Sequence, residues 1–316
     1  MSAYFGEEEC SAVYKSGTKK GLRCRNKAYY QVDEEVLLCG VHSAKLERTE
    51  LPKNPNAAKN EEEQRKEHKK SVEAAAEKNR AEYKTGSVVV SKMRMMKKVE
   101  PKVGYLSVFP NYKHGNRQDG LGLPRLSPKS LGPVQHKMPG LTEAQNLENF
   151  WQFSKAFAFE VDTDGKLLPL FEEKRKKGFA DATPHRHKYE KKVLSKYSSN
   201  VNKPLFSVFV DKHGKERRFS YIQARYFYCK IYEELAQKEE DFGKLQDLIS
   251  EGYNLNLVGY DGYEVGDDLM GHYLDESQPF GHELVLYTLL TREEDEYPWN
   301  VYRAKHEDLY AGIDLL

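Results

Sequence analysis

Three cysteines and one histidine lie in the first 45 residues, and they restrict how this segment can fold more than any other feature of the chain does. They are Cys10, Cys24, Cys39 and His42, with the spacing C-x13-C-x14-C-x2-H. Three thiolates and one imidazole form a closed tetrahedral shell, the arrangement of a structural zinc site. A segment this short has little hydrophobic material of its own and needs such a staple. We therefore expect residues 1–45 to form a zinc-binding head.

Two other interpretations of these cysteines stay open, namely reduced and unrelated thiols, or one disulfide with a spare thiol. Four cysteines in 316 residues do not make a disulfide framework. The first residues, MSAYFGEEEC, have neither the basic nor the apolar part of a secretory signal, and no run approaches 18 apolar residues. We expect an intracellular protein, cytoplasmic or nuclear, that is not secreted and has no membrane partner, with virion association as one option.

Charge is distributed unevenly along the chain, although the formal net charge is +1. Residues 231–316 carry 21 acidic and 5 basic side chains, whereas the residues before them carry 28 acidic and 45 basic ones. One interpretation is an acidic surface and a basic surface that neutralise each other after folding. The other is a basic region that binds a polyanion.

Composition divides the rest of the chain into three parts. Residues 46–86 are highly charged and rich in alanine, without an apolar stripe, which predicts a solvated helix or a disordered linker. Residues 87–140 are basic and interrupted by Pro and Gly, which predicts an irregular arm lying on the domain or on a partner. Residues 141–316 contain most of the aromatic material and should form the globular body.

The body mixes helical and extended patterns. Helices are expected over 142–160, with Thr142 as its cap, and over 220–238 and 242–250, beside a hairpin over 203–219 and a strand over 254–258. The apolar run 281–290 is expected to be a buried helix, with a buried strand as the alternative. This order predicts an α+β (or α/β) fold with a mixed sheet covered by helices. Loops typical of Walker NTPases, Rossmann dehydrogenases, zincin proteases and α/β-hydrolases are absent from the sequence, so these classes are not expected.

The head has the form Cys…Gly-x-x-Cys…Cys-Gly-x-His, with Gly21 and Gly40 at the glycine positions. It resembles a short zinc module found in proteins of large double-stranded DNA viruses and in some eukaryotic proteins. Basic residues over 19–27 lie beside Tyr29 and Tyr30, so we expect nucleic acid or another polyanion to bind here and along residues 90–140. A protein-binding or purely structural head is the alternative.

The body carries a second resemblance, in residues 205–290. Phe206, Ser207 and Phe209 match an F-S-x-F strand, Gly214 and Lys215 a G-K turn, Lys230 a helix lysine, Asp261 and Tyr263 an aspartate-aromatic loop, and 284–290 a closing apolar helix. Together these features resemble the NADAR superfamily, whose members process ADP-ribose-like and riboflavin-pathway N-glycosides. The resemblance implies a nucleotide-like small-molecule ligand and hydrolysis of an N-glycosidic bond.

The sequence departs from this family where a helix-opening Glu is replaced by Gln223, which cannot act as a general acid or base. The family's G-x-N turn also reads Gly281-His282-Glu283. Two alternatives therefore remain: an N-glycosidase, or a non-catalytic nucleic-acid-binding or virion structural protein.

The resemblance assigns catalytic roles to Asp261 and Lys230. The residues expected to bind the substrate are Gln223, Arg225, Tyr260, Tyr263 and His282. Carboxylates and histidines crowd the segment between Asp261 and Glu283, which nominates the same region on residue type alone. His185 and His187 alternate, so on an extended segment both point the same way and can contact a metal or a phosphate.

Overall fold

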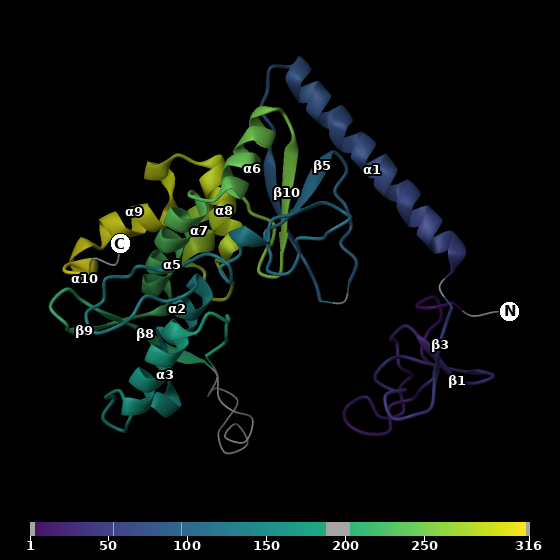
Figure 1. The fold of residues 1–316 in the computed structure, drawn as a ribbon, viewed down its shortest axis with the longest axis horizontal. Helices are drawn as coiled ribbons and strands as arrows, with labels where there is room; N and C mark the ends of the chain where they lie inside the picture. The colour runs from purple at the N-terminus through teal and green to yellow at the C-terminus, as the bar shows by residue number, and fades with distance from the viewer. Residues whose placement is uncertain (1–3, 53, 96, 188–202, 314–316) are drawn as a thin grey trace. The chain divides into compact units, whose positions relative to one another are not determined.

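The computed structural model describes residues 4–52, 54–95, 97–187 and 203–313 (Figure 1). The chain divides into two compact units, Met1–His68 and Lys69–Leu316. No helix among the described residues is both long enough and apolar enough to cross a membrane.

The first unit contains a small antiparallel sheet in the order β2-β1-β3. Its strands are β1 (Tyr30–Asp33), β2 (Val36–Leu38) and β3 (Thr49–Glu50). The buried core beside this sheet consists of Leu38 and the three cysteines of the head. So small an apolar core supplies little folding free energy, which agrees with the expectation that a bound metal ion stabilises this unit.

Helix α1 (Pro55–Ala81) occupies most of the segment for which the sequence allowed a solvated helix or a disordered linker. Its last turns are not fully solvated, because Val72 and Ala76 are buried. The Asn79 amide donates hydrogen bonds to the Gly252 carbonyl at 2.8 Å and to Asn254 Oδ1 at 3.1 Å. The C-terminal part of α1 is therefore attached to the second unit.

The second unit contains a parallel sheet in the order β4-β10-β5-β6. The strands are β4 (Val88–Lys92), β5 (Tyr105–Phe109), β6 (Leu121–Gly122) and β10 (Asn254–Gly259). Three of them come from residues 87–140, so this segment forms part of the sheet of the body, and the prediction of an irregular arm lying on the domain or on a partner is wrong. The cause is long-range pairing: β10 lies between β4 and β5 and satisfies their backbone groups from about 150 residues away along the chain.

A second sheet is antiparallel, in the order β7-β8-β9, with β7 (Lys155–Phe157), β8 (Pro204–Val210) and β9 (Glu216–Phe219). The predicted hairpin is confirmed. The helix predicted over 142–160 is much shorter, because α2 spans only Leu147–Phe153 and is capped by Asn146 rather than by Thr142. Residues of β7 leave the helical path because they pair with β8.

The remaining helices confirm the α+β class. They are α3 (Pro169–Ala180), α5 (Tyr221–Ala236), α6 (Glu240–Ser250), α7 (Leu269–Leu274), α8 (His282–Thr291), α9 (Pro298–Lys305) and α10 (Glu307–Tyr310). Helices α5, α6 and α8 are the helices predicted from the sequence. Helix α8 packs on β4 and β10, and α5 packs on α8, so the main core lies between the parallel sheet and these two helices (Figure 1).

Candidate metal centre and candidate substrate site

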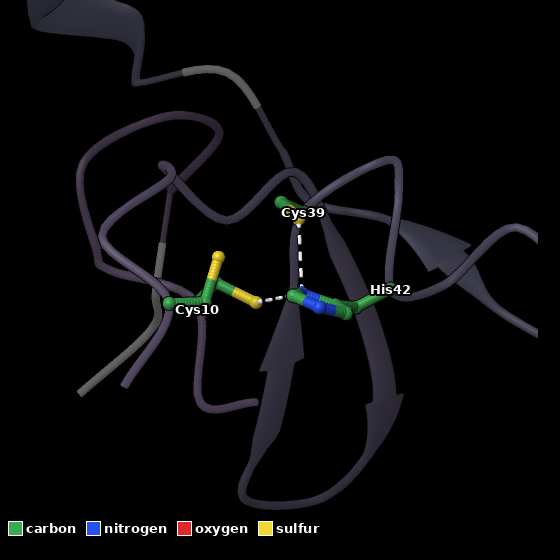
Figure 2. Close-up of side chains that lie close together, drawn as sticks. Cys10, Cys39 and His42 are labelled. Carbon is green, nitrogen blue, oxygen red and sulfur yellow. Dashed lines mark hydrogen bonds between the residues drawn. The ribbon is translucent and has the colours of Figure 1, made fainter. Parts of the chain in front are cut away.

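The four predicted metal ligands of the head converge. The ligand atoms of Cys10, Cys24, Cys39 and His42 all lie within 4.8 Å of one another. His42 Nδ1 is 3.4 Å from Cys10 Sγ and 3.4 Å from Cys39 Sγ (Figure 2). A tetrahedral zinc ion with bonds of about 2.3 Å to sulfur and 2.0 Å to nitrogen separates its ligands by roughly 3.5 Å. The cluster can therefore hold a metal ion, and its donors are compatible with zinc.

Backbone pairing brings the ligands together from distant positions. Cys10 and Cys24 lie on facing arms of a hairpin, where the Cys10 N–H donates to the Asn26 carbonyl and the Cys24 N–H to the Ala12 carbonyl, each at 2.8 Å. Cys39 directly follows β2, and the Ser43 N–H and hydroxyl both donate to its carbonyl. This closed turn presents His42 beside the cysteines.

Polar groups around Cys39 favour its thiolate form, whereas burial raises the pKa of the Cys10 thiol. Burial acts to raise the pKa of the Cys39 thiol, but the backbone N–H groups of His42 and Val41 and the Asn26 amide outweigh it and lower that pKa to about 6. The Asn26 amide lies 3.7 Å from Cys39 Sγ, and the Tyr14 hydroxyl lies 3.7 Å from Cys24 Sγ. Donors of this kind orient metal ligands and tune their basicity.

Two residues of α5 that the resemblance nominated, Lys230 and Gln223, make contacts that stabilise the fold. The Lys230 ammonium lies 2.7 Å from Glu233 Oε1, and the other oxygen of Glu233 accepts a hydrogen bond from the Trp299 indole at 2.8 Å, which ties α5 to α9. Gln223 forms a capping box with Ser220 at the start of α5. The charges that act on Lys230 are glutamates of α5 and Glu294, and Asp261 is not among them.

Arg225 is buried, and its guanidinium donates to the carbonyls of Tyr273, Asp275 and Gln278. It thereby fixes the loop after α7. The guanidinium also lies 4.6 Å from the centre of the Tyr221 ring. Arg225 therefore packs against Tyr221 at the start of α5.

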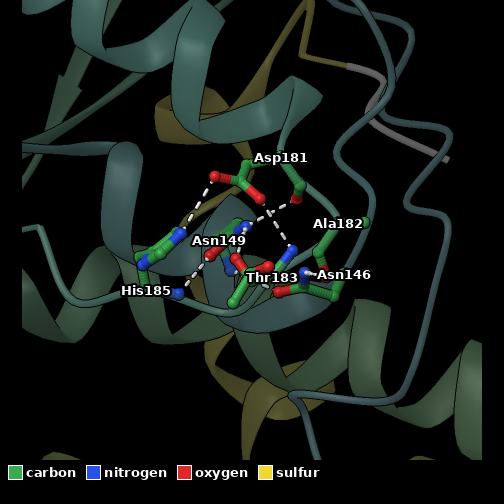
Figure 3. Close-up of polar contacts among 6 residues, drawn as sticks. All are labelled: Asn146, Asn149, Asp181, Ala182, Thr183 and His185. Atoms are coloured by element: carbon green, nitrogen blue, oxygen red, sulfur yellow. Dashed lines mark hydrogen bonds and ion pairs between the residues drawn. The ribbon is translucent and has the colours of Figure 1, made fainter.

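His185 and His187 do not form a shared site. His185 is exposed, and its Nε2 lies 2.9 Å from Asp181 Oδ2. Its backbone N–H donates a hydrogen bond to Asn149 Oδ1 (Figure 3). His187 is buried, with Nε2 2.6 Å from Glu160 Oε1 and its ring stacked on Phe153. The predicted pair of ligands pointing the same way is therefore wrong, because each imidazole has its own acidic partner. Among the described residues, the head cluster alone brings three or more such ligands together.

The segment between these histidines and α3 is held against α2. The Asn149 amide donates to the carbonyls of Asp181 at 2.8 Å and Thr183 at 2.9 Å, and the Asn146 amide donates to the Ala182 carbonyl at 3.3 Å (Figure 3). This network fixes the backbone just before Arg186, whose charge acts on Lys155.

Asp261 follows β10, at the carboxyl edge of the parallel sheet, where open α/β sheets commonly bind ligands. The start of α8 packs against the same edge: a Cβ at Gly281 would lie 2.8 Å from the Cβ of Asp261. His282 Nε2 lies 2.8 Å from the Pro110 carbonyl, and its Nδ1 lies 3.3 Å from the fully buried Glu283 carboxylate. His282 therefore connects α8 with the end of β5.

The two tyrosines of this loop differ. Tyr260 is 45% exposed, with its ring 6.3 Å from that of His114 in an edge-on arrangement, so much of its surface can contact a ligand. Tyr263 packs beside His272, and its buried hydroxyl has no hydrogen-bond partner among the described residues. Burial raises the pKa of Tyr263 to about 12.

Lys155, on β7, is the main site residue that the sequence did not indicate. Its ammonium lies 4.3 Å from the centre of the Trp151 ring. Lys155 is partly buried, and this burial lowers its pKa to about 7. The charges of Glu148, Arg186 and Asp261 also act on the ammonium. The charge of Asp261, nominated from the sequence, thus acts to keep Lys155 protonated.

Aromatic side chains continue from Lys155. The Trp151 ring lies 5.2 Å from that of Tyr228 and 6.2 Å from that of Tyr221. Burial raises the pKa of Tyr228 well above its ordinary value, and the charges of Glu148 and Glu283 act in the same direction. We call Lys155, Asp261, Glu148, Trp151, Tyr221 and Tyr228 the Lys155 site. It combines a lysine that titrates near neutral pH with carboxylates and an aromatic wall.

No family model, curated protein or solved structure matches this chain.

Proposed function

We propose that the chain is a zinc-binding protein whose body binds a nucleotide-like N-glycoside and hydrolyses it. In the head, the zinc is structural, because all four ligands come from the protein and leave no position for substrate. The convergence of four donors within 4.8 Å supports this part. Zinc content of the purified protein, measured by mass spectrometry, tests it, with one zinc ion per chain expected.

For the body, the observation that carries the proposal is the placement of the Lys155 ammonium over Trp151 and within the field of Asp261. Hydrolysis of an N-glycoside breaks the bond between the sugar C1 and a base nitrogen. The nitrogen must receive a proton, and C1, which becomes positively charged in the transition state, must receive water. A lysine with a pKa near 7 and a nearby carboxylate are suited to these two tasks.

The roles follow from charge. Lys155, in its ammonium form, donates the proton to the departing nitrogen. Asp261 stabilises the positive charge that develops at C1 and accepts a proton from the attacking water. The products are the free sugar and the free base, and the proton that Lys155 donates equals the one that Asp261 accepts. Trp151 is partly buried, and the part of its ring that is accessible offers a surface on which a base can stack.

This assignment modifies what the resemblance to NADAR proteins implied. Asp261 keeps the expected role, whereas Lys155 takes the role that the resemblance gave to Lys230, whose amine is bonded to Glu233. Gln223 acts as a helix cap, so the replacement of Glu at that position leaves the Lys155 site intact.

Titration of the full chain with ADP-ribose by calorimetry tests binding, and release of free base from nucleotide N-glycosides, followed by chromatography, tests catalysis. We expect saturable binding that Asp261→Ala weakens at least tenfold, and turnover that Lys155→Gln reduces by about 100-fold or more. Lys129→Gln removes an exposed lysine elsewhere on the body and is the matched control. Absence of heat at millimolar ligand would reject the substrate site and leave the non-catalytic alternative, an interaction protein.

A further inference from the structure

The hairpin that carries Cys10 and Cys24 has a regular backbone ladder. Besides the bonds of the two cysteines, the Tyr14 N–H donates to the Leu22 carbonyl and the Gly21 N–H to the Tyr14 carbonyl. Gly17 and Gly21 lie in the left-handed region at φ +77° and +84°, which closes the tip without a side-chain clash. Side chains on this hairpin are therefore presented in a fixed arrangement.

From Cys10 onward the charge of this hairpin has one sign, whereas Glu7, Glu8 and Glu9 extend its first arm and the backbone of Glu9 pairs with that of Lys27. Residues 10–32 contain six basic residues and no acidic one. The basic residues are Lys15, Lys19, Lys20, Arg23, Arg25 and Lys27, and all six side chains are exposed. In the part of the chain that the structure describes, they make no salt bridge, although the Lys27 amine donates to the Glu7 carbonyl at 2.9 Å.

Part of this charge is grouped near the tip of the hairpin. Cys24 is fully buried beside the other metal ligands, whereas Arg23 and Arg25, on either side of it, are exposed. In extended backbone, neighbouring side chains point to opposite faces, and residues two apart are separated by about 6.7 Å. Lys19 and Lys20 lie in the turn at the tip, so the hairpin carries a cluster of exposed cations.

The aromatic residues near the hairpin are already in contact with other side chains. The Tyr29 ring lies 4.6 Å from that of Phe5, and the Arg48 guanidinium covers the Tyr30 ring at 3.9 Å. The head therefore offers cations to a partner rather than stacking surfaces, which differs from the expectation of base contacts drawn from the sequence. The only large apolar side chain exposed between residues 15 and 27 is that of Leu22, too little for the apolar centre of a protein interface.

We infer that this hairpin binds the phosphate backbone of nucleic acid without reading its sequence. The function is separate from the proposed substrate site, because it uses residues of the first unit alone. Binding by phosphate contacts releases counterions, so the affinity must fall steeply with salt. Four contacts, from Lys19, Lys20, Arg23 and Arg25, predict a loss of about 100-fold between 50 and 200 mM salt.

Fluorescence anisotropy of the full chain with labelled duplex DNA of about 20 base pairs tests the inference. We expect binding at 50 mM salt with equal affinity for unrelated sequences. The variant Lys19→Gln/Lys20→Gln/Arg23→Gln/Arg25→Gln should lose both the affinity and most of the salt dependence, while it retains its zinc. The matched control, Lys92→Gln/Arg94→Gln/Lys97→Gln/Lys102→Gln, removes the same charge from exposed body residues within the segment predicted to bind polyanions.

Three outcomes would overturn the inference. One is the absence of DNA binding at 50 mM salt. Another is loss of binding in the body variant but not in the head variant, which would place the surface in residues 90–140. The third is complete displacement of DNA by an equal charge concentration of polyglutamate, which would assign the hairpin to an acidic protein partner.

Discussion

The Lys155 ammonium lies over the indole ring of Trp151, 4.3 Å from its centre and four residues away along the chain. This pair joins the end of α2 to β7, and the charge of Asp261, more than 100 residues later, acts on the same ammonium. Lys155 is partly buried and forms no salt bridge with the described residues, so it costs stability, because burial disfavours its charged form. Such a residue is more readily explained by a task at a site than by packing.

The destabilisation of the folded protein by Lys155 should depend on pH. Because burial lowers its folded-state pKa to about 7 from an ordinary value of 10.5, the folded protein binds fewer protons than the unfolded chain between these values. The destabilisation is therefore complete below pH 7 and is relieved as the pH rises from 7 to 10.5. We expect Lys155→Met to raise the free energy of unfolding by about 1–2 kcal/mol at pH 6, and by much less at pH 10. Urea denaturation at both pH values measures the difference; an equal gain at both would contradict a lowered pKa.

One matched pair of variants distinguishes the metal-binding cysteines from Cys229, the buried cysteine of the body. Cys24→Ser removes a ligand, so the zinc content should fall from one ion per chain and the head should become sensitive to protease. Cys229→Ser makes the same change in the core of the body, where the thiol is buried and distant in sequence from the head, so the zinc content should remain at one. Plasma mass spectrometry of both variants gives the ratio. Equal zinc in both would show that the cluster does not hold the ion.

Local signals account for most of what the sequence predicted. The start of α5 at Ser220, the hairpin of β8 and β9, and the four ligands of the head all follow from residues close together in sequence. Strands β4 and β5 were missed because their partner β10 is supplied from far along the chain. Their short apolar runs lie between Pro and Gly residues that on their own indicate irregular structure.

The same limit applies to the site. Asp261 could be nominated because carboxylates and histidines crowd its loop, whereas Lys155 looked like a surface residue of a longer helix. The pairing of β7 with β8 takes Lys155 out of the helical path and places it on a strand. Gln223 is a different case, because Ser220-x-x-Gln223 is a capping-box pattern that indicates its structural role directly. The carbonyl groups that Arg225 contacts lie 48 to 53 residues away along the chain and have no local signature, whereas the partner of Lys230, Glu233, lies three residues away on the same helix.

The buried pair of His187 and Glu160 should contribute strongly to stability. Glu160 is fully buried; its other oxygen accepts the Phe157 N–H at 3.1 Å. Replacing the imidazole in His187→Phe leaves this carboxylate without its closest partner, at an expected cost of about 2–4 kcal/mol. His185→Phe is the control, since its ion pair with Asp181 is exposed and should contribute less than about 1 kcal/mol. Chemical denaturation compares the two, and similar costs would contradict a buried pair.

Gly259, the last residue of β10, has no room for a side chain. A Cβ there would lie 1.6 Å from Glu283 Oε1, so Gly259→Ala must displace a fully buried carboxylate at the start of α8. We expect a loss of about 2–4 kcal/mol in the free energy of unfolding. Glu283→Ala removes the obstruction, so the double variant should be less destabilised than the two single costs predict, with a coupling of about 1 kcal/mol or more.

Gly243→Ala provides the control for this double-mutant cycle of Gly259→Ala and Glu283→Ala. Gly243 lies within α6, and a Cβ there meets nothing within 4 Å, so alanine should stabilise the helix by about 0.5–1 kcal/mol. Combined with Glu283→Ala, it should show additive effects, because the two positions share no contact. Additivity in the Gly259 cycle as well would mean that Glu283 does not lie against the end of β10. The packing that holds α8 beside Asp261 would then need another explanation.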